Sequence, residues 1–190
     1  QKLERAGSML GAEQRHLIQA RSGIYFTDQP LEGKLAFMFP GEGSQYRGML
    51  DELAVYLPLV REWFDFWDTL YQGQREVLPS QIVYQPPTGV DIAVREMLET
   101  RLNDVAIGSE AVFIASQALF ALLSALELGA DAMLGHSSGE NTAMVAAGVM
   151  RLVDREKLRQ YIINLKQLYR QIGSLGVIAS GCLLTVGAVE

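Results

Sequence analysis

The stretch ADAMLGHSSGENTAM, residues 130–144, places two serines between two glycines, directly after a short apolar run and before a helical pattern. Gly135, Ser137 and Gly139 match the pattern G-x-S-x-G, in which a nucleophilic serine sits on a strained turn between a strand and a helix. Both glycines are needed because this tight turn leaves no room for side chains two positions away. The symmetry selects Ser137, and not Ser138, as the candidate nucleophile.

Ser138 begins the predicted helix, so its backbone N–H is placed to donate to an oxyanion, and the helix dipole adds positive charge there. The alternative is a glycine-rich turn whose serines cap the helix. His136 is a poor general base for its neighbour because adjacent side chains at such a turn diverge. His16, the other histidine, is expected on a solvated helix. We therefore expect the base of Ser137 to lie outside this chain.

The composition is that of an ordinary globular protein: 190 residues, 49% hydrophobic and 20% charged. The net charge of −6 and the pI near 5.0 argue against nucleic acid and anionic membranes as partners. A single cysteine, Cys182, excludes an internal disulfide and favours a reducing, cytoplasmic compartment. The most apolar segment, residues 112–128, contains Gln117 and Glu127 and falls short of the roughly 20 apolar residues of a membrane span. It predicts a core helix.

Apolar spacing predicts an alternation of strands and helices, which is typical of a parallel sheet with both faces covered. Residues 35–39 form a continuous apolar run, expected as a strand buried on both faces. Pro86 and Pro87 interrupt a loop over residues 72–89. Helices are predicted at residues 3–21, 51–71, 91–102, 109–128 (closed by Gly129), 138–149 and 154–172, and further strands at residues 131–137 and in residues 179–190.

A second motif, FPGEGSQYRGM, occupies residues 39–49. A phosphate-binding loop is excluded, because Gly41, Gly43 and Gly48 do not form G-x-G-x-x-G and no P-loop lysine follows. Together with GHSSGE, this stretch resembles the acyltransferase domains of polyketide and fatty acid synthases and the related malonyl-CoA:acyl carrier protein transacylases. That family typically has F-P-G-Q-G-S-Q followed by G-M, and G-H-S-x-G-E. The resemblance extends from about Lys34 to the C-terminus.

The resemblance implies an α/β fold with a three-layer, parallel-sheet core that resembles an α/β-hydrolase. Residues 1–33 would be a linker or docking helix next to a ketosynthase, residues 34–178 an incomplete acyltransferase core, and residues 179–190 the start of a small ferredoxin-like subdomain. The family's catalytic histidine lies beyond that point.

The resemblance also implies the chemistry. Ser137 would take an acyl group from acyl-CoA and pass it to the phosphopantetheine thiol of an acyl carrier protein, with no tightly bound cofactor and no metal. The backbone N–H groups of Ser138 and Glu42 would form the oxyanion hole. Glu42 stands where the family has glutamine, and its carboxylate is expected to turn away or be paired because it would repel an oxyanion.

Two substrate positions depart from the family. Ser109 stands where members often have glutamine, and Ile162 stands where malonyl-using members carry an arginine for the substrate carboxylate. Arg159 and Lys166 lie three and four positions from Ile162, close enough to share a helix face and supply a replacement charge. Malonyl and an uncharged acyl unit such as acetyl both remain open.

Two rival interpretations remain. A serine hydrolase of the esterase kind also uses G-x-S-x-G on a parallel sheet, although FPGEGSQY argues against it. The chain could also be a non-catalytic docking module that keeps the turn only as structure.

Overall fold

The computed structural model describes residues 1–9, 16–27, 29, 32–86, 88–152 and 154–174, although the side chains of 16–20 and 172–174 lie outside this description. The chain divides into two units, Gln1–Lys34 and Leu35–Glu190. The strand predicted within residues 179–190, with Cys182, falls outside the described residues.

The first unit contains one helix and a β-hairpin. Helix α1 spans Lys2–Met9, and strands β1 (His16–Gln19) and β2 (Ile24–Thr27) pair antiparallel around a 3₁₀ turn at Ala20–Ser22. The prediction of a helix over residues 3–21 is therefore wrong for residues 16–21, and His16 lies on a strand. The backbone groups of β1 find their partners in β2, a pairing that apolar spacing within residues 3–21 does not reveal.

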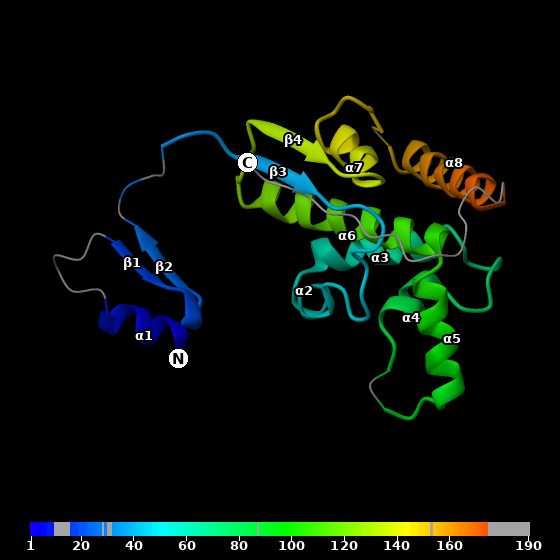
Figure 1. Ribbon diagram of the computed structural model, residues 1–190, viewed down its shortest axis with the longest axis horizontal. Helices are drawn as coiled ribbons and strands as arrows, with labels where there is room; N and C mark the ends of the chain where they lie inside the picture. The colour runs from blue at the N-terminus through cyan, green and yellow to red at the C-terminus, as the bar shows by residue number, and fades with distance from the viewer. Residues whose placement is uncertain (10–15, 28, 30–31, 87, 153, 175–190) are drawn as a thin grey trace. The chain divides into compact units, whose positions relative to one another are not determined.

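The second unit is built on two parallel strands, β3 (Ala36–Phe39) and β4 (Ala132–Gly135), in the register Ala36↔Ala132 to Phe39↔Gly135 (Figure 1). The Asp131 carboxylate accepts the Leu35 N–H at 2.9 Å where the two strands begin. The predicted parallel pairing and α/β class are confirmed. The connection between the strands contains α2 (Asp51–Tyr56), α3 (Pro58–Thr69), α4 (Pro79–Val83), α5 (Ile92–Leu102) and α6 (Val105–Ala125), and β4 is followed by α7 (Gly139–Ala146) and α8 (Arg155–Ser174).

Helices cover one face of this two-stranded sheet. Phe37 and Phe39 meet Phe120 of α6 edge to face, each with ring centroids 6.3 Å apart. On the opposite face Met38 is 80% exposed and Leu134 is 55% exposed. The prediction of a strand buried on both faces is therefore wrong, and no third layer covers this second face within the part of the chain that the structure describes.

Two helices depart from the predicted boundaries because of proline. The helix expected over residues 51–71 is broken at Leu57, whose extended backbone (φ −119°, ψ 102°) is the conformation favoured before a proline. Pro58 then starts α3, since the first position of a helix needs no N–H donor. Pro79 starts α4 in the same way, inside the segment predicted as a loop.

Helix α6 begins earlier than predicted because Asp104 caps it. The Asp104 carboxylate accepts the N–H groups of Ala106 and Ile107 at 3.0 and 3.2 Å. The left-handed residue after the helix is Glu127 (φ 59°), and not the predicted Gly129.

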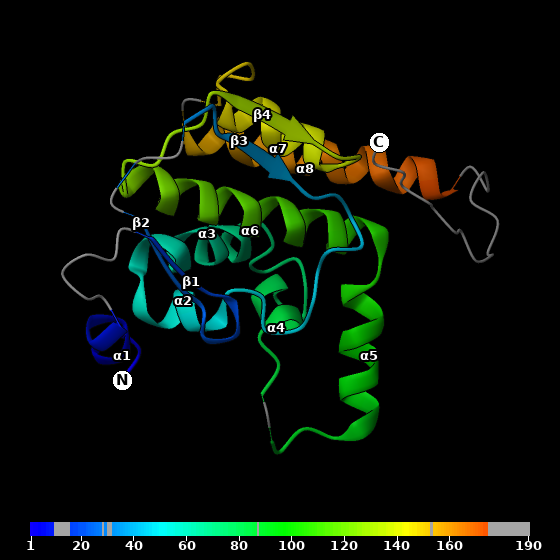
Figure 2. The same ribbon diagram turned by 60° about the vertical axis from the view of Figure 1, so that its left-hand side comes forward.

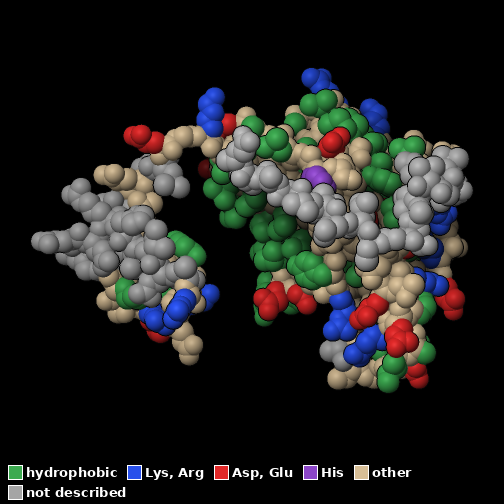
Figure 3. All heavy atoms as spheres, viewed as in Figure 1, with side chains coloured by type: hydrophobic (Ala, Val, Ile, Leu, Met, Phe, Trp, Pro, Cys, Tyr) green, Lys and Arg blue, Asp and Glu red, His purple; other side chains and the backbone are tan. Residues whose placement is uncertain are grey.

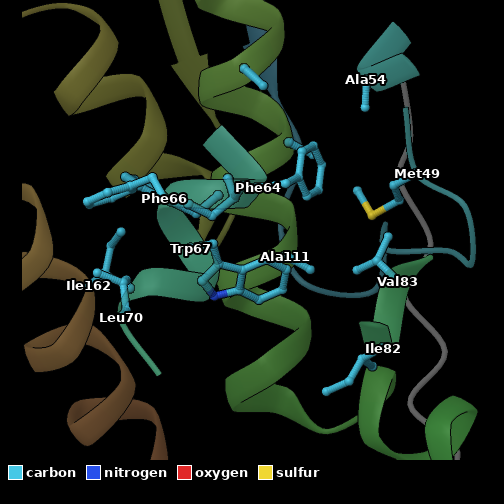
Figure 4. Packing of buried hydrophobic residues seen from close by; sticks show 14 of the residues in the cluster. Met49, Ala54, Phe64, Phe66, Trp67, Leu70, Ile82, Val83, Ala111 and Ile162 are labelled. Atoms are coloured by element: carbon cyan, nitrogen blue, oxygen red, sulfur yellow. The ribbon is translucent and has the colours of Figure 1, made fainter. Parts of the chain in front are cut away.

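The hydrophobic core lies where α3 and α8 pack against α6 (Figures 2 and 4). Trp67, Phe64, Ile114 and Ile162 are each at most 2% exposed. By length and composition α6 could cross a membrane. Its first half is buried among the other helices, as predicted for a core helix, whereas its C-terminal half contributes to a hydrophobic surface (Figure 3).

Candidate active site

The two sequence motifs meet at the carboxyl ends of β3 and β4. Carboxyl ends of parallel strands lie at the same edge of a sheet, which is where α/β proteins build their sites. The His136 N–H donates to the Phe39 carbonyl at 3.0 Å and continues the strand pairing into both motifs. GHSSGE and FPGEGSQ, far apart in the sequence, therefore form one local structure.

Three glycines allow this close approach. A Cβ on Gly41 would lie 2.6 Å from the His136 carbonyl oxygen and 3.0 Å from the Ser137 Cβ. A Cβ on Gly139 would press on the carbonyl oxygens of Phe39 and Pro40, and one on Gly135 would press on the backbone of the following helical turn. A side chain at Gly41 or Gly139 would push the two motifs apart, and one at Gly135 would distort the turn that leads into α7.

Ser137 has a left-handed backbone, with φ 54°, which is uncommon for a residue other than glycine. It lies between β4 and α7, and its side chain is exposed. This is the strand–turn–helix geometry that G-x-S-x-G describes. No side chain caps α7, so the alternative of a capping serine lacks its hydrogen bond.

Ser138 is buried, and its hydroxyl oxygen accepts the Glu42 N–H at 2.7 Å. One of the two expected oxyanion donors is therefore occupied by a side chain. The Ser138 N–H makes no hydrogen bond among the described residues and lies at the start of α7. The Glu42 carboxylate accepts a hydrogen bond of 3.4 Å from the Gln45 side-chain amide, so it is paired, as we expected.

Polar side chains surround Ser138. Burial raises the pKa of the Tyr169 hydroxyl, whereas the neighbouring Ser138, Asn141 and Ser109 side chains lower it. The Ser109 Oγ is buried and has no hydrogen-bond partner of good geometry in the described part of the chain, although Tyr169 lies near it. Ser109 therefore lies near Tyr169, which also neighbours Ser138, and its contact with substrate stays a prediction.

Sequence reasoning missed the tyrosines of α8. Tyr161 donates to Asn141 Oδ1 at 2.8 Å, and burial raises the Tyr161 pKa to about 12. Tyr161 and Tyr169 lie about two helical turns apart and so share one face of α8. The separation of Tyr161 and Tyr169 by about two helical turns is the signal in the sequence that could have indicated a shared polar face.

Two of the three predicted substrate residues on α8, Ile162 and Lys166, pack against other side chains of the core. Ile162 is 1% exposed and packs in the core near Leu70 and Phe66 (Figure 4), so the structure does not bring it to Ser137. The Lys166 Nζ lies 4.3 Å from the centre of the Tyr71 ring, and burial lowers its pKa. Arg159 is half-buried, with no ion pair among the residues described.

In the described part of the chain, no histidine side chain makes a hydrogen bond to the Ser137 hydroxyl. His136 is exposed, and its ring makes no hydrogen bond within the described ranges. His16 belongs to the first unit, and its side chain is not described. In the described residues no group of three or more His, Cys, Asp or Glu side chains could hold a metal ion.

Comparison with known proteins gives the family. The family model for the acyl transferase domain matches residues 36–174. The chain belongs to the acyl transferase domain family. This domain is 34% identical over 158 residues to a phenolphthiocerol synthesis type I polyketide synthase of Mycobacterium marinum, with 83% of this chain and 7% of that protein covered. It is 33% identical over 135 residues to the malonyl CoA-acyl carrier protein transacylase of Escherichia coli K12, with 66% of this chain and 36% of that protein covered.

Solved structures agree with this assignment. An acyl carrier protein S-malonyltransferase of Vibrio cholerae matches with a TM-score of 0.59 and 27% identity, covering 78% of this chain and 42% of that one. A malonyl-transacylase in complex with its type II polyketide synthase acyl carrier protein matches with a TM-score of 0.58 and 26% identity, covering 75% and 40%. The acyl transferase domain here thus spans less than half the length of these relatives. Neither the α/β-hydrolase likeness nor a ferredoxin-like subdomain follows from these matches.

Proposed function

We propose that this acyl transferase domain moves an acyl unit from coenzyme A to the phosphopantetheine thiol of an acyl carrier protein, through an ester on Ser137. The observation that carries the proposal is the left-handed backbone of Ser137 at the meeting point of the two motifs, beside the Ser138 N–H, which no described residue accepts. The names of the relatives, a malonyl CoA-acyl carrier protein transacylase and a complex with an acyl carrier protein, support the substrate pair.

In the proposed reaction the Ser137 Oγ attacks the thioester carbonyl and gives its proton to a general base. The Ser138 N–H stabilises the oxyanion, and the Glu42 N–H joins it once the Ser138 hydroxyl releases this donor. Collapse of the tetrahedral intermediate expels coenzyme A as the thiol and leaves an acyl ester. The carrier thiol then reverses these steps, which is ping-pong catalysis. We assign the base to a residue outside these 190 residues.

The acyl unit is the open part of the proposal. Ile162 offers no charge and lies in the core, and Lys166 lies over Tyr71. Of the residues predicted from the sequence, Arg159 is the one left for holding a malonyl carboxylate, whereas an uncharged acyl group needs no such partner. A competition between acetyl-CoA and malonyl-CoA, followed as acyl-Ser137, decides between them. Preference for malonyl that survives Arg159→Gln would remove Arg159 from the site.

Mass spectrometry of the intact protein tests the nucleophile. General-base help is typically worth about 10²–10⁴-fold, so we expect slow, single acylation of the chain during long incubation with acyl-CoA, without steady-state transfer. The adduct should be lost in Ser137→Ala and kept in Ser138→Ala. The opposite result would assign the nucleophile to Ser138, and an adduct on neither serine would reject the proposal.

The same experiment separates transferase from hydrolase. Added pantetheine should take up the acyl group faster than water does if the domain is a transferase. Release to water alone, unaffected by the thiol, would favour the serine hydrolase. We also propose that the domain works in the cytoplasm, with an acyl carrier protein and a ketosynthase as its partners. The similarity to a malonyl CoA-acyl carrier protein transacylase and to a type I polyketide synthase supports these partners.

A further inference from the structure

A basic cavity lies at the start of α6, apart from Ser137. Its volume is about 730 Å³, and its lining includes Arg75, Arg101 and Arg170. These arginines come from the segment before α4, the end of α5 and the end of α8. Three guanidinium groups around one cavity are a marked local concentration in a chain whose net charge is −6.

The carboxylates close to this cavity already have partners. The Asp104 carboxylate accepts the N–H groups of Ala106 and Ile107 at the start of α6. Glu110, one helical turn further along α6, accepts hydrogen bonds of 2.8 Å from Trp67 Nε1 and from the Tyr71 hydroxyl, and its oxygen lies 3.9 Å from Arg75 Nη2. Among the ion pairs of the described residues, Glu110 is the acidic partner of Arg75, and Asp104 lines the cavity itself.

The cations near this cavity, three arginines and Lys166, outnumber its two neighbouring carboxylates, Asp104 on the lining and Glu110. Arg75 stacks on Tyr71, 3.6 Å from the ring centre, and its Nη1 is buried without a hydrogen-bond partner among the described residues. The Lys166 Nζ lies 4.3 Å from the centre of the same ring. Burial lowers the Lys166 pKa, and the positive charges of Arg75 and Arg170 lower it further. Arg101 and Arg170 are exposed, and the ion pairs of the described residues include neither of them.

We propose that this cavity binds a phosphate group of a ligand, with Arg101 and Arg170 in contact and Arg75 adding charge from the wall. The planar guanidinium matches phosphate with two parallel N–H donors, and a recessed site strengthens the attraction. Asn103 and Thr100 on the lining offer further polar contacts.

The cavity is joined to the candidate active site by two short connections. Arg170 follows Tyr169, which neighbours Ser138. The Gln45 side-chain amide donates to the Leu102 carbonyl at 3.3 Å and to the Glu42 carboxylate at 3.4 Å, so it ties the end of α5 to the first motif. This link rests on the proposed function: the phosphate belongs either to coenzyme A or to the phosphopantetheine arm of the carrier, each of which ends in the thiol that serves Ser137.

Isothermal titration calorimetry with pyrophosphate tests the site directly. We expect saturable binding to the 190-residue chain, weakened at least tenfold in Arg101→Gln/Arg170→Gln. The control pair Arg95→Gln/Arg155→Gln removes the same charge from the same two helices at positions that do not line the cavity. Circular dichroism verifies the fold of both. Absence of saturable binding, or an equal loss in the control pair, would overturn the proposal.

Loading of Ser137 identifies the source of the phosphate. Acetyl-CoA carries phosphates and acetyl-pantetheine carries none, so Arg101→Gln/Arg170→Gln should slow loading only from acetyl-CoA if coenzyme A occupies the cavity. Slower transfer to the carrier alone would assign the cavity to the carrier's phosphodiester. Unchanged loading and transfer would overturn the link to acyl transfer. No adduct from either thioester would reject the proposed function and leave the phosphate site to be decided by calorimetry.

Discussion

Glu110 is a carboxylate buried in the helical core, 2% exposed, and it joins Trp67, Tyr71 and Arg75. Glu110→Ala would leave two buried donors and a guanidinium without their partner, and removal of one member of a buried ion pair typically costs about 3–5 kcal/mol. We expect a loss of that size in the free energy of unfolding, measured by urea denaturation. Glu110→Gln keeps an acceptor oxygen and should lose less. Equal losses in the two variants would show that the hydrogen bonds contribute nothing.

The same residue makes stability depend on pH. Burial raises the Glu110 pKa above its ordinary value of 4.5, against the opposing effects of Trp67, Tyr71, Arg75 and Lys166. The folded state then holds the proton more tightly than the unfolded state does, so this group favours folding at low pH. Its contribution to stability is lost as the pH rises from 4.5 through the folded-state pKa. Glu110→Gln should remove this part of the dependence of the unfolding free energy on pH. Identical pH profiles for the variant and the unchanged chain would contradict a raised pKa at Glu110.

Ile162 illustrates how an alignment position and a structural position differ. An ungapped alignment equates it with a substrate-binding arginine, yet its side chain is buried in the core. Ile162→Arg should therefore cost several kcal/mol of stability, measured by chemical denaturation, and should not create malonyl selectivity. The matched control is Leu168→Arg on the same helix, where the side chain is 51% exposed. A stable Ile162→Arg variant that prefers malonyl would restore the sequence-based assignment.

The turn between β4 and α7 packs against the first motif, FPGEGSQYRGM, and Gly41 is the residue of that motif that contacts it. Gly41→Ala would place a methyl group against the His136 carbonyl and the Ser137 Cβ. We expect acyl loading of Ser137 to slow at least tenfold, because a small displacement of a catalytic group costs about 10²-fold in rate. Gly129→Ala, with nothing within 4 Å of the added Cβ, is the control. Unchanged loading in Gly41→Ala would show that acylation of Ser137 does not depend on this contact between the two motifs.

Local signals decided which elements the sequence could predict. Strands β3 and β4 and the turn at Ser137 were predicted because apolar runs and glycines act within a few residues. Pro58 accounts for the break at Leu57, but the amphipathic pattern of residues 51–71 continues across it and predicts a single helix. The hairpin of β1 and β2 was missed because its pairing partners lie outside the local window. The Glu110 contacts join residues 39 and 43 positions apart, beyond the reach of spacing arguments.

The exposure of Met38 and Leu134 also depends on distant residues. A continuous apolar run predicts a strand covered on both sides, but whether cover exists depends on how many strands and helices pack around it. In the second unit the described residues supply a sheet of two strands, β3 and β4, with helices against one face. The polar group around Ser138 likewise needed the docking of α8, which places Tyr169 near Ser109.

The division into Gln1–Lys34 and Leu35–Glu190 predicts two separable folding units. Both tryptophans, Trp63 and Trp67, lie on α3, so tryptophan fluorescence reports only on the second unit. Deletion of residues 1–34 should change the free energy of unfolding seen by fluorescence by no more than about 0.5 kcal/mol, the range typical of changes away from packed contacts. Guanidinium titrations of the full and shortened chains provide the comparison. A larger loss, or a changed slope of the transition, would show that residues 1–34 stabilise the core that carries Ser137.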